Sequence, residues 1–383
     1  MSLSFRRYIL ALSPALVLWS CTDSASVTEP DVPPDNYVAF AVPGDDQGAT
    51  TTMSIRDFKV FAYTQAPWGI GQIIMPFTVV TRTNLNNWTY SPKIEWPEEP
   101  VDFNCVSPAS IDMSNEYSVR TISYNKNSNT QAYTGGDVDL LIASRVNVDP
   151  RSGRLKFNFR HALTQLKIAL RATDTGNTSV EVYKVYLQGR AEGKLFIPME
   201  DTTPETNDGS LLNNWTIYSK SGPELPFFDP VDGGYLVLTD KATDTAPDGK
   251  FVIPMTLDDY YYEYYARGTY IEVVYRITDN DTGATVWPDA STPGDQVWLR
   301  DKTYASAKFG LKADTPEGTW YPGKRYMYTV RMDGQRLRNP RRETRNSAPV
   351  TDVEKHAGDQ QGYAEAVIDT DVAQITSTGQ GQQ

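Results

Sequence analysis

The sequence contains very little cysteine and histidine. Its 383 residues include two cysteines and two histidines. Cys21 lies in an N-terminal segment that indicates a secretory signal, so Cys105 has no partner for an internal disulfide. The second histidine, His356, lies in a polar tail, and it forms no pair with His161 that would suit a metal site or a proton relay. We therefore expect no cofactor and a fold stabilised by buried apolar area.

Positive charge and helix-forming runs are also scarce. The chain has 36 Lys and Arg against 48 Asp and Glu, a formal charge of -12, without a long basic face. This balance argues against a nucleic-acid partner. Long runs of Ala, Leu, Glu and Lys are missing, whereas Tyr (23), Gly (26) and Pro (25) are abundant. That composition predicts many short strands joined by turns.

The chain begins with an apolar run, residues 8–19, that follows two arginines. It is too short for a stable transmembrane helix and predicts a signal peptide over residues 1–20. The next residue completes a Leu-Trp-Ser-Cys sequence that resembles a bacterial lipobox, in which Cys21 is diacylated and becomes the new N-terminus. An ordinary signal with an incidental cysteine is the alternative. Acyl chains on Cys21 would hold residues 21–36, a polar tether with prolines, at a membrane.

Alternation of apolar and polar residues with period two recurs along the rest of the chain and predicts strands. Clear examples are residues 38–42, 58–63, 180–187, 271–277 and 326–332. Turn signals rich in Gly, Asn and Asp lie between them. The polar, proline-containing segment 199–209 separates two strand-rich blocks, so we predict an all-β chain with antiparallel β-sandwiches over 37–200 and 201–335 and a tail over 336–383.

The stretch FNFRHALTQLKIAL, residues 157–170, contains His161 at a break in the strand alternation. A bulge or a single helical turn would produce such a shift of register. We expect His161 to be a structural hydrogen-bonding residue. A Cys105–His161 dyad is the catalytic alternative, but Cys105 lacks the Gly-rich context of thiol nucleophiles. We therefore expect no enzymatic activity.

Several motifs together resemble one protein family. They are Leu140-Leu-Ile-Ala143 followed by residues 155–166 with the sequence LKFNFRHALTQL, Trp96-Pro97, Val101-Asp-Phe103, Ser107-Pro108, and residues 320–328 with the sequence WYPGKRYMY. In this order they resemble the motifs of fimbrillin-like proteins, the subunits of type V pili of anaerobic Gram-negative bacteria.

The resemblance implies two transthyretin-like β-sandwich domains and export as an outer-membrane lipoprotein. It also implies a structural or adhesive role in a cell-surface fimbrium, with other fimbrial subunits as partners. In this family a protease removes the first strand, and the C-terminal strand of a neighbouring subunit fills the gap. This donor-strand exchange restores both the backbone pairing and the apolar burial that the first strand supplied.

Candidate residues for each step of this assembly can be named in the sequence. Val38, Phe40 and Val42 form the candidate removable strand just after the tether. Arg56 is the first basic residue after Cys21, which makes it the candidate cleavage site for a trypsin-like or Arg-specific protease. The alternative is that Arg56 is only a surface residue at the entrance of a strand.

The candidate donor strand lies in the tail. Ala364, Ala366, Ile368 and Val372 share one face of an alternating segment. The same segment is alternatively the last strand of its own domain or an unstructured tail. An Arg-rich segment precedes it and contains Arg336, Arg338, Arg341, Arg342 and Arg345. This segment could bind an anionic neighbour or lipopolysaccharide, provide a second protease site, or serve as a solvated linker.

The alternative function is a monomeric surface lipoprotein that binds glycans. Aromatic rings suited to stacking on sugars occur in Tyr260–Tyr265 and at Trp287 and Trp298. Such rings also commonly cover a sheet. The loop Asp279-Asn-Asp-Thr-Gly283 is rich in oxygen ligands, but it fits a hairpin turn better than a calcium loop. The sequence does not distinguish a stalk, tip or anchor position in a fibre.

Overall fold

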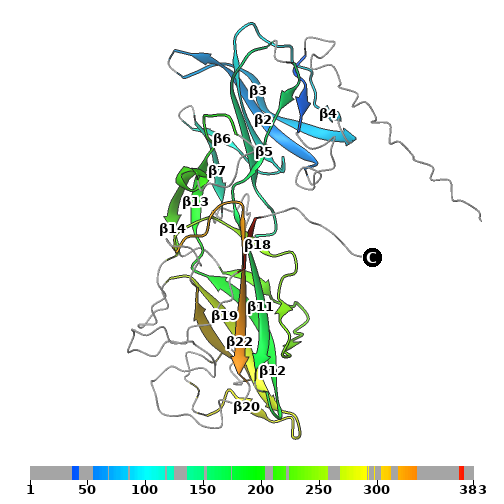
Figure 1. The fold of residues 1–383 in the computed structure, drawn as a ribbon, viewed down its shortest axis with the longest axis vertical. Helices are drawn as coiled ribbons and strands as arrows, with labels where there is room; N and C mark the ends of the chain where they lie inside the picture. The colour runs from blue at the N-terminus through cyan, green and yellow to red at the C-terminus, as the bar shows by residue number, and fades with distance from the viewer. Residues whose placement is uncertain are drawn as a thin grey trace, which may run out of the picture.

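The described part of the chain consists almost entirely of β-structure (Figure 1). This computed structural model describes residues 37–42, 55–67, 69–84, 87–116, 119–124, 136–150, 153–173, 175–202, 210–220, 224–257, 268–290, 292, 297, 303–311, 318–333 and 371–374. They form strands β1 to β23 and one short 3-10 helix, η1 (Ser210–Asn214). No helix among these residues is long and apolar enough to cross a membrane. The predicted all-β class is confirmed.

The N-terminal sheet has six antiparallel strands in the order β10-β8-β5-β2-β3-β4. Their bounds are β2 (Asp57–Ala66), β3 (Gly69–Asn84), β4 (Asn87–Thr89), β5 (Val101–Ser107), β8 (Leu141–Val148) and β10 (Arg160–His161). Both faces of this sheet are covered, since every residue of β5 is buried. Along β2, Phe58 and Val60 belong to one apolar cluster, which we call the first core. Phe61 and Tyr63 belong to another, which we call the second core. The sheet therefore separates two cores.

Two smaller sheets contribute to these cores. In the first core, β1 (Phe40–Ala41) pairs in parallel with β9 (Leu155–Lys156). The second core contains Ile122 and Leu195 from a four-stranded sheet with the order β14-β13-β7-β6. The bounds of its strands are β6 (Ser114–Glu116), β7 (Val119–Tyr124), β13 (Glu192–Phe196) and β14 (Trp215–Ser219).

The C-terminal part is a sandwich of two sheets around the continuation of the second core, since its buried residues belong to the same apolar cluster as Phe61 and Ile122. One sheet has the order β17-β11-β22-β23, with β18 also on β11, and the other has the order β15-β12-β19-β20, with β16 on β12 and β21 on β19. The bounds are β11 (Thr164–Thr173), β12 (Thr178–Gln188), β15 (Leu225–Phe228), β16 (Leu236–Val237), β17 (Thr243–Asp244), β18 (Lys250–Val252), β19 (Tyr270–Asp279), β20 (Thr285–Trp287), β21 (Ala305–Gly310), β22 (Lys324–Asp333) and β23 (Asp371–Gln374).

The central pair of the first C-terminal sheet is parallel, which corrects the prediction of purely antiparallel sandwiches. β11 and β22 run side by side from Gln165 opposite Arg325 to Thr173 opposite Asp333. Parallel neighbours need a long crossover connection, and here the strands of the second sheet lie in the sequence between the two. The alternation of apolar and polar residues along a strand does not indicate whether the neighbouring strand runs parallel or antiparallel.

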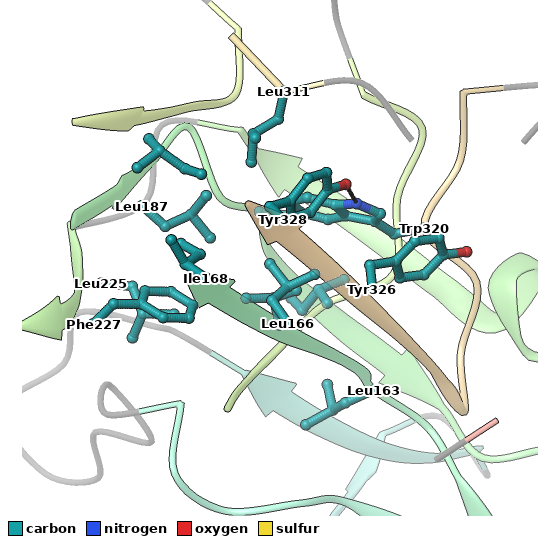
Figure 2. Packing of buried hydrophobic residues seen from close by; sticks show 14 of the residues in the cluster. Leu163, Leu166, Ile168, Leu187, Leu225, Phe227, Leu311, Trp320, Tyr326 and Tyr328 are labelled. Carbon is teal, nitrogen blue, oxygen red and sulfur yellow. Dashed lines mark hydrogen bonds between the residues drawn. The ribbon is translucent and has the colours of Figure 1, made fainter. Parts of the chain in front are cut away.

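Figure 2 shows the core between these two sheets. Leu166 and Ile168 of β11 and Tyr326 and Tyr328 of β22 are buried in it. The indole of Trp320 lies beside Tyr328, and its Nε1 donates a hydrogen bond of 2.6 Å to the Tyr328 hydroxyl. The alternation read in the sequence therefore places one row of each strand in this core.

Two of the motifs that carry the family resemblance meet in space. The backbone N–H of Gly323, in the PGK motif, donates to the carbonyl of Leu163, in the HAL motif, over 2.8 Å. The hydroxyl of Thr164 donates in return to the carbonyl of Tyr321 at 2.8 Å. Gly323 has a positive φ of 68°, which glycine adopts without strain. The two motifs fix the start of the parallel pair β11 and β22.

The chain passes from the N-terminal sheet to the C-terminal sandwich near His161, and the predicted domain boundary at residues 200 and 201 stays a prediction. β10 belongs to the N-terminal sheet and β11 to the C-terminal sandwich. In the sequence, the segment 199–209 lies between β13 and β14, which pair as antiparallel neighbours with Leu195 opposite Trp215.

Candidate assembly site

The N-terminal segment, residues 37–42, is packed into the first core. Val38, Phe40 and Val42 are at most 3% exposed. The intervening Ala39 and Ala41 are only partly buried, so the predicted alternation holds over these residues. The segment lies against the protein and supplies apolar side chains to its interior.

Phe40 lies at the centre of an aromatic cluster. Its ring stacks on Phe157 with centroids 5.7 Å apart, and it meets Phe58, Tyr90 and Phe103 edge-on at 5.7, 5.5 and 6.5 Å. Phe58 and Phe103 belong to β2 and β5, two inner strands of the six-stranded sheet. The segment therefore covers a face of that sheet, where a strand at its edge would have been the simplest expectation.

Few backbone hydrogen bonds hold this segment. The N–H of Val38 donates to the carbonyl of Ile94 over 3.0 Å. The N–H groups of Leu155 and Phe157 donate to the carbonyls of Ala39 and Ala41 over 2.8 and 3.1 Å. Only Phe40 and Ala41 count as a strand. Apolar burial, more than backbone pairing, attaches the segment.

Arg56 lies where the chain enters the six-stranded sheet. Its side chain is exposed, while the preceding residue, Ile55, is buried in the first core. The carbonyl of Arg56 accepts a hydrogen bond of 2.9 Å from the N–H of Arg82. The next residue, Asp57, begins β2, and its carboxylate accepts a hydrogen bond of 2.6 Å from the N–H of Ala109. The side chain is accessible, but the backbone on both sides is held.

Comparison with known protein families identifies the family of this chain. The sequence pattern of the fimbrillin-like family matches residues 48–344. This chain belongs to the fimbrillin-like family. No match was found among curated proteins. A fimbrillin is a structural protein of a fimbrium and not an enzyme. The resemblance inferred from the sequence is confirmed, and membership of this family also supports a role without catalysis.

Several solved structures are similar to this fimbrillin-like chain. A fimbrial protein from Bacteroides vulgatus is 17% identical over 79% of this chain and 96% of its own, with a TM-score of 0.47. A fimbrilin from Porphyromonas gingivalis is 12% identical over 78% and 90%, with a TM-score of 0.39. The tip fimbrial protein Mfa3 from Porphyromonas gingivalis is 10% identical over 78% and 95%, with a TM-score of 0.31.

The other predicted assembly residues of this fimbrillin-like chain lie mostly outside the described residues. This applies to Cys21, Ala364, Ala366 and Ile368 and to the Arg-rich segment. Val372 lies in β23, whose backbone pairs antiparallel with β22, with Val372 opposite Tyr326. The described end of the candidate donor segment therefore rests on the edge of its own C-terminal sheet, as the alternative reading of this segment supposed.

His161 and Cys105 both occupy structural environments. The Nδ1 atom of His161 lies 2.5 Å from Oδ2 of Asp139 at the end of the N-terminal sheet. Cys105 is fully buried in the first core, and burial raises the pKa of its thiol well above the ordinary value. A thiol nucleophile needs a lowered pKa. The environment of Cys105 therefore opposes the catalytic alternative.

One of the aromatic residues proposed for glycan binding, Trp287, is not available as a platform. Trp287 is buried and stacks on the fully buried Tyr275 with ring centroids 4.3 Å apart. Tyr260–Tyr265 and Trp298 lie outside the described residues. In the loop after β19, Asp279 accepts hydrogen bonds from the N–H groups of Asp281 and Thr282, as the predicted hairpin turn requires. No group of potential metal ligands occurs among the residues that the structure describes.

The sequence reasoning missed the residues that receive the N-terminal segment. Tyr90 was not singled out, although its hydroxyl donates a 2.7 Å hydrogen bond to the carbonyl of Val38. Phe157 was recognised only as part of a motif. The available signal was the density of aromatic residues after β3 and before β10, but which of them face Phe40 depends on long-range pairing.

Proposed function

We propose that this fimbrillin-like chain is a structural or adhesive subunit of a type V pilus. It is exported as an outer-membrane lipoprotein through acylation of Cys21 and assembles with other subunits by donor-strand exchange. Residues 1–20 are the signal peptide and residues 21–36 the tether. The fold proposed for the remainder is two transthyretin-like β-sandwich domains.

The observation that supports this proposal most strongly is the mode of attachment of residues 37–42. Burial of Val38, Phe40 and Val42 contributes about 1.5–3 kcal/mol for each side chain, whereas few backbone hydrogen bonds join the segment to the fold. Such a segment is stable while it is covalently attached. It leaves an apolar groove walled by Phe58, Phe103 and Phe157 when it is removed. An apolar groove with unpaired backbone groups accepts an extended strand from another chain.

Cleavage after Arg56 would separate this segment from the sheet that it covers. The exposed side chain of Arg56 suits an Arg-specific or trypsin-like protease. A protease binds its substrate in an extended form, so the hydrogen bond between Arg56 and Arg82 must open first. After cleavage, residues 37–56 and the lipid anchor are linked to the subunit only by non-covalent contacts, and a donor strand can compete for the groove.

The donor is the C-terminal segment that contains Ala364, Ala366, Ile368 and Val372. Its described part, β23, has only short contact with β22, from Met327 to Lys324. A strand held at an edge by so few residue pairs exchanges more readily than a central strand. In the polymer this segment would leave its own sheet and enter the groove of the next subunit.

The test is limited trypsin digestion of the purified chain, followed by electrophoresis in mild detergent and mass spectrometry of the new N-terminus. We expect ladders of detergent-resistant oligomers with an N-terminus at Asp57. The variant Arg56→Ala should give no ladder, whereas Lys241→Ala, which removes another exposed basic residue, should behave as the wild type. A ladder that persists in Arg56→Ala, or oligomers that begin at another residue, would refute the proposed cleavage.

A further inference from the structure

The C-terminal sandwich contains a polar cavity at the end remote from the N-terminal segment. It has a volume of about 590 Å³ and is lined by parts of four separate segments. These are the end of β11 with the turn that follows it, the start of β12, the connection between β16 and β17, and the turn after β19. In Figure 1 this end, near β12 and β20, lies opposite the end that carries β3 and β4.

Backbone hydrogen bonds hold the walls of the cavity. The N–H of Leu238 donates to the carbonyl of Val180 over 2.9 Å, and the N–H of Ala172 donates to the carbonyl of Thr239 over 2.7 Å. Residues 238–239 therefore bridge the two sheets of the sandwich. On the opposite side, the Ser179 hydroxyl donates to Oδ1 of Asn280 over 2.6 Å. A cavity that is framed in this way is formed before any ligand arrives.

Four polar groups of the lining have no hydrogen-bond partner among the residues that the structure describes. Arg171 Nε is buried without a hydrogen-bond acceptor. The hydroxyl of Thr173, the carboxylate of Asp240 and the side-chain nitrogen of Asn280 also have no partner in the described part of the chain. A buried donor without an acceptor costs free energy. Arg171 Nε is the buried donor among these groups, whereas Asp240 and Asn280 are exposed and are hydrogen-bonded by water until a ligand displaces it.

The charge around Arg171 favours an anion. Arg171 lies directly opposite Arg331 in the parallel pair β11 and β22. Arg331 has an interaction partner of its own and does not line the cavity, so the positive charge of the lining is that of Arg171. A guanidinium binds a carboxylate through two parallel hydrogen bonds.

The rest of the lining favours hydroxyl groups. Asp240 accepts hydrogen bonds, the Asn280 amide nitrogen donates them, and the Thr173 hydroxyl does both. Apolar surface in the lining is confined mainly to Ala172 and Leu238, so an apolar ligand has little to pack against. The carboxylate of Asp240 also disfavours a ligand with several negative charges. A cavity of this size accommodates one or two sugar rings.

We propose that this cavity binds an acidic sugar residue of a glycan, with the sugar carboxylate on Arg171 and its hydroxyls on Thr173, Asp240 and Asn280. The site does not depend on donor-strand exchange. It would give the subunit a lectin function at the end of the molecule remote from the proposed assembly groove.

The experiment is calorimetric titration of the purified full-length chain with N-acetylneuraminic acid and with glucuronic acid. Glucose and acetate serve as comparison ligands. We expect saturable binding of at least one acidic sugar. Glucose and acetate should bind at least about tenfold more weakly, because glucose lacks the carboxylate and acetate lacks the sugar hydroxyls. Acetate that binds as tightly as the sugars would overturn the assignment of the sugar hydroxyls. The absence of saturable binding by both acidic sugars would overturn the proposal.

Single-residue variants test whether the acidic sugar binds in this cavity. Arg171→Gln should weaken the acidic sugar by about tenfold or more, whereas Lys167→Gln removes the same charge from the same strand outside the cavity lining and should bind as the wild type. Equal losses in both variants would show general electrostatic attraction and overturn the proposal. If Arg171→Gln does not fold, Asn280→Ala in the turn after β19 replaces it, and unchanged binding in that variant would count against the site.

Discussion

The ring of Phe40 stacks on the ring of Phe157 with an interplanar angle of 27° and centroids 5.7 Å apart. The two residues are far apart in the sequence. Phe40 is the first residue of β1 and Phe157 directly follows β9, and these two strands form the parallel pair over the face of the six-stranded sheet. This contact joins the removable segment to the permanent core. It makes the stability of the uncleaved chain depend on residues that the proposed maturation removes.

The variant Phe40→Ala should strongly destabilise the uncleaved chain. Removal of a fully buried phenyl ring leaves a cavity and costs about 3–5 kcal/mol of unfolding free energy. Urea denaturation followed by tryptophan fluorescence measures this loss. Tyr37→Ala is the matched control, because Tyr37 belongs to the same segment but is 36% exposed, and it should change the free energy by less than about 1 kcal/mol. Equal stability of the two variants would show that the segment does not support the core.

Gly189 should not tolerate alanine. A Cβ atom at this position would lie 2.1 Å from the carbonyl oxygen of Gly268, and φ is +73°. Gly233 has the same φ of +73°, but a Cβ there would meet nothing within 4 Å. Each Gly→Ala change carries the backbone strain of about 1 kcal/mol or more, and only Gly189→Ala adds the steric clash. We expect a clearly lower midpoint of thermal unfolding for Gly189→Ala than for Gly233→Ala, and similar midpoints would contradict the close approach.

Asp229 should contribute stability that depends on pH. Its Oδ1 lies 2.8 Å from Nζ of Lys184, and its Oδ2 accepts a 2.9 Å hydrogen bond from Tyr186. Burial alone would raise the pKa of Asp229, but the hydrogen bonds from Lys184 and Tyr186 outweigh burial and lower the pKa. Burial raises the pKa of Tyr186 to about 12, so the phenol remains a donor near neutral pH.

A carboxyl group with a lowered pKa in the folded state stabilises the fold above its unfolded pKa of about 3.9. That contribution is lost as the pH falls through the folded pKa. The difference in thermal midpoint between wild type and Asp229→Asn should therefore be present at pH 7 and at pH 5 and should narrow at pH 3. Asp248→Asn is the control, since it makes the same change at an exposed carboxylate that has no partner in the described structure. A constant difference for Asp229→Asn would contradict the ion-pair assignment.

The sequence predicted local features of the fold well and long-range pairing poorly. The alternation of Val38, Phe40 and Val42 predicted their burial, because side chains of a strand point alternately to opposite faces. The parallel pairing of β11 with β22 was not predictable, since it joins segments separated by most of the second sheet. Neither strand carries a local sign of its neighbour or of its direction.

For the candidate site, too, the sequence predicted local features and did not predict contacts between distant segments. Arg56 was singled out correctly as an exposed basic residue at the start of a strand, because that property is local. Cleavage there stays a prediction. The aromatic walls of the groove come from β2, β5 and the segment after β9, and the polar cavity comes from the ends of β11 and β12 and from three turns and connections. Sites assembled from distant segments require the tertiary fold before they can be recognised.

Cys105 should report on the presence of the N-terminal segment. Its thiol is fully buried in the same apolar cluster as Phe40, and burial raises its pKa. In a chain with Cys21→Ser, Cys105 should react with a thiol reagent such as DTNB only through opening of this cluster. Phe40→Ala lowers the free energy of that opening and should raise the labelling rate in native buffer by about tenfold or more. Tyr37→Ala should label as slowly as the parent chain. Fast labelling of the parent chain, or equal rates in all three proteins, would show that the N-terminal segment does not protect this core.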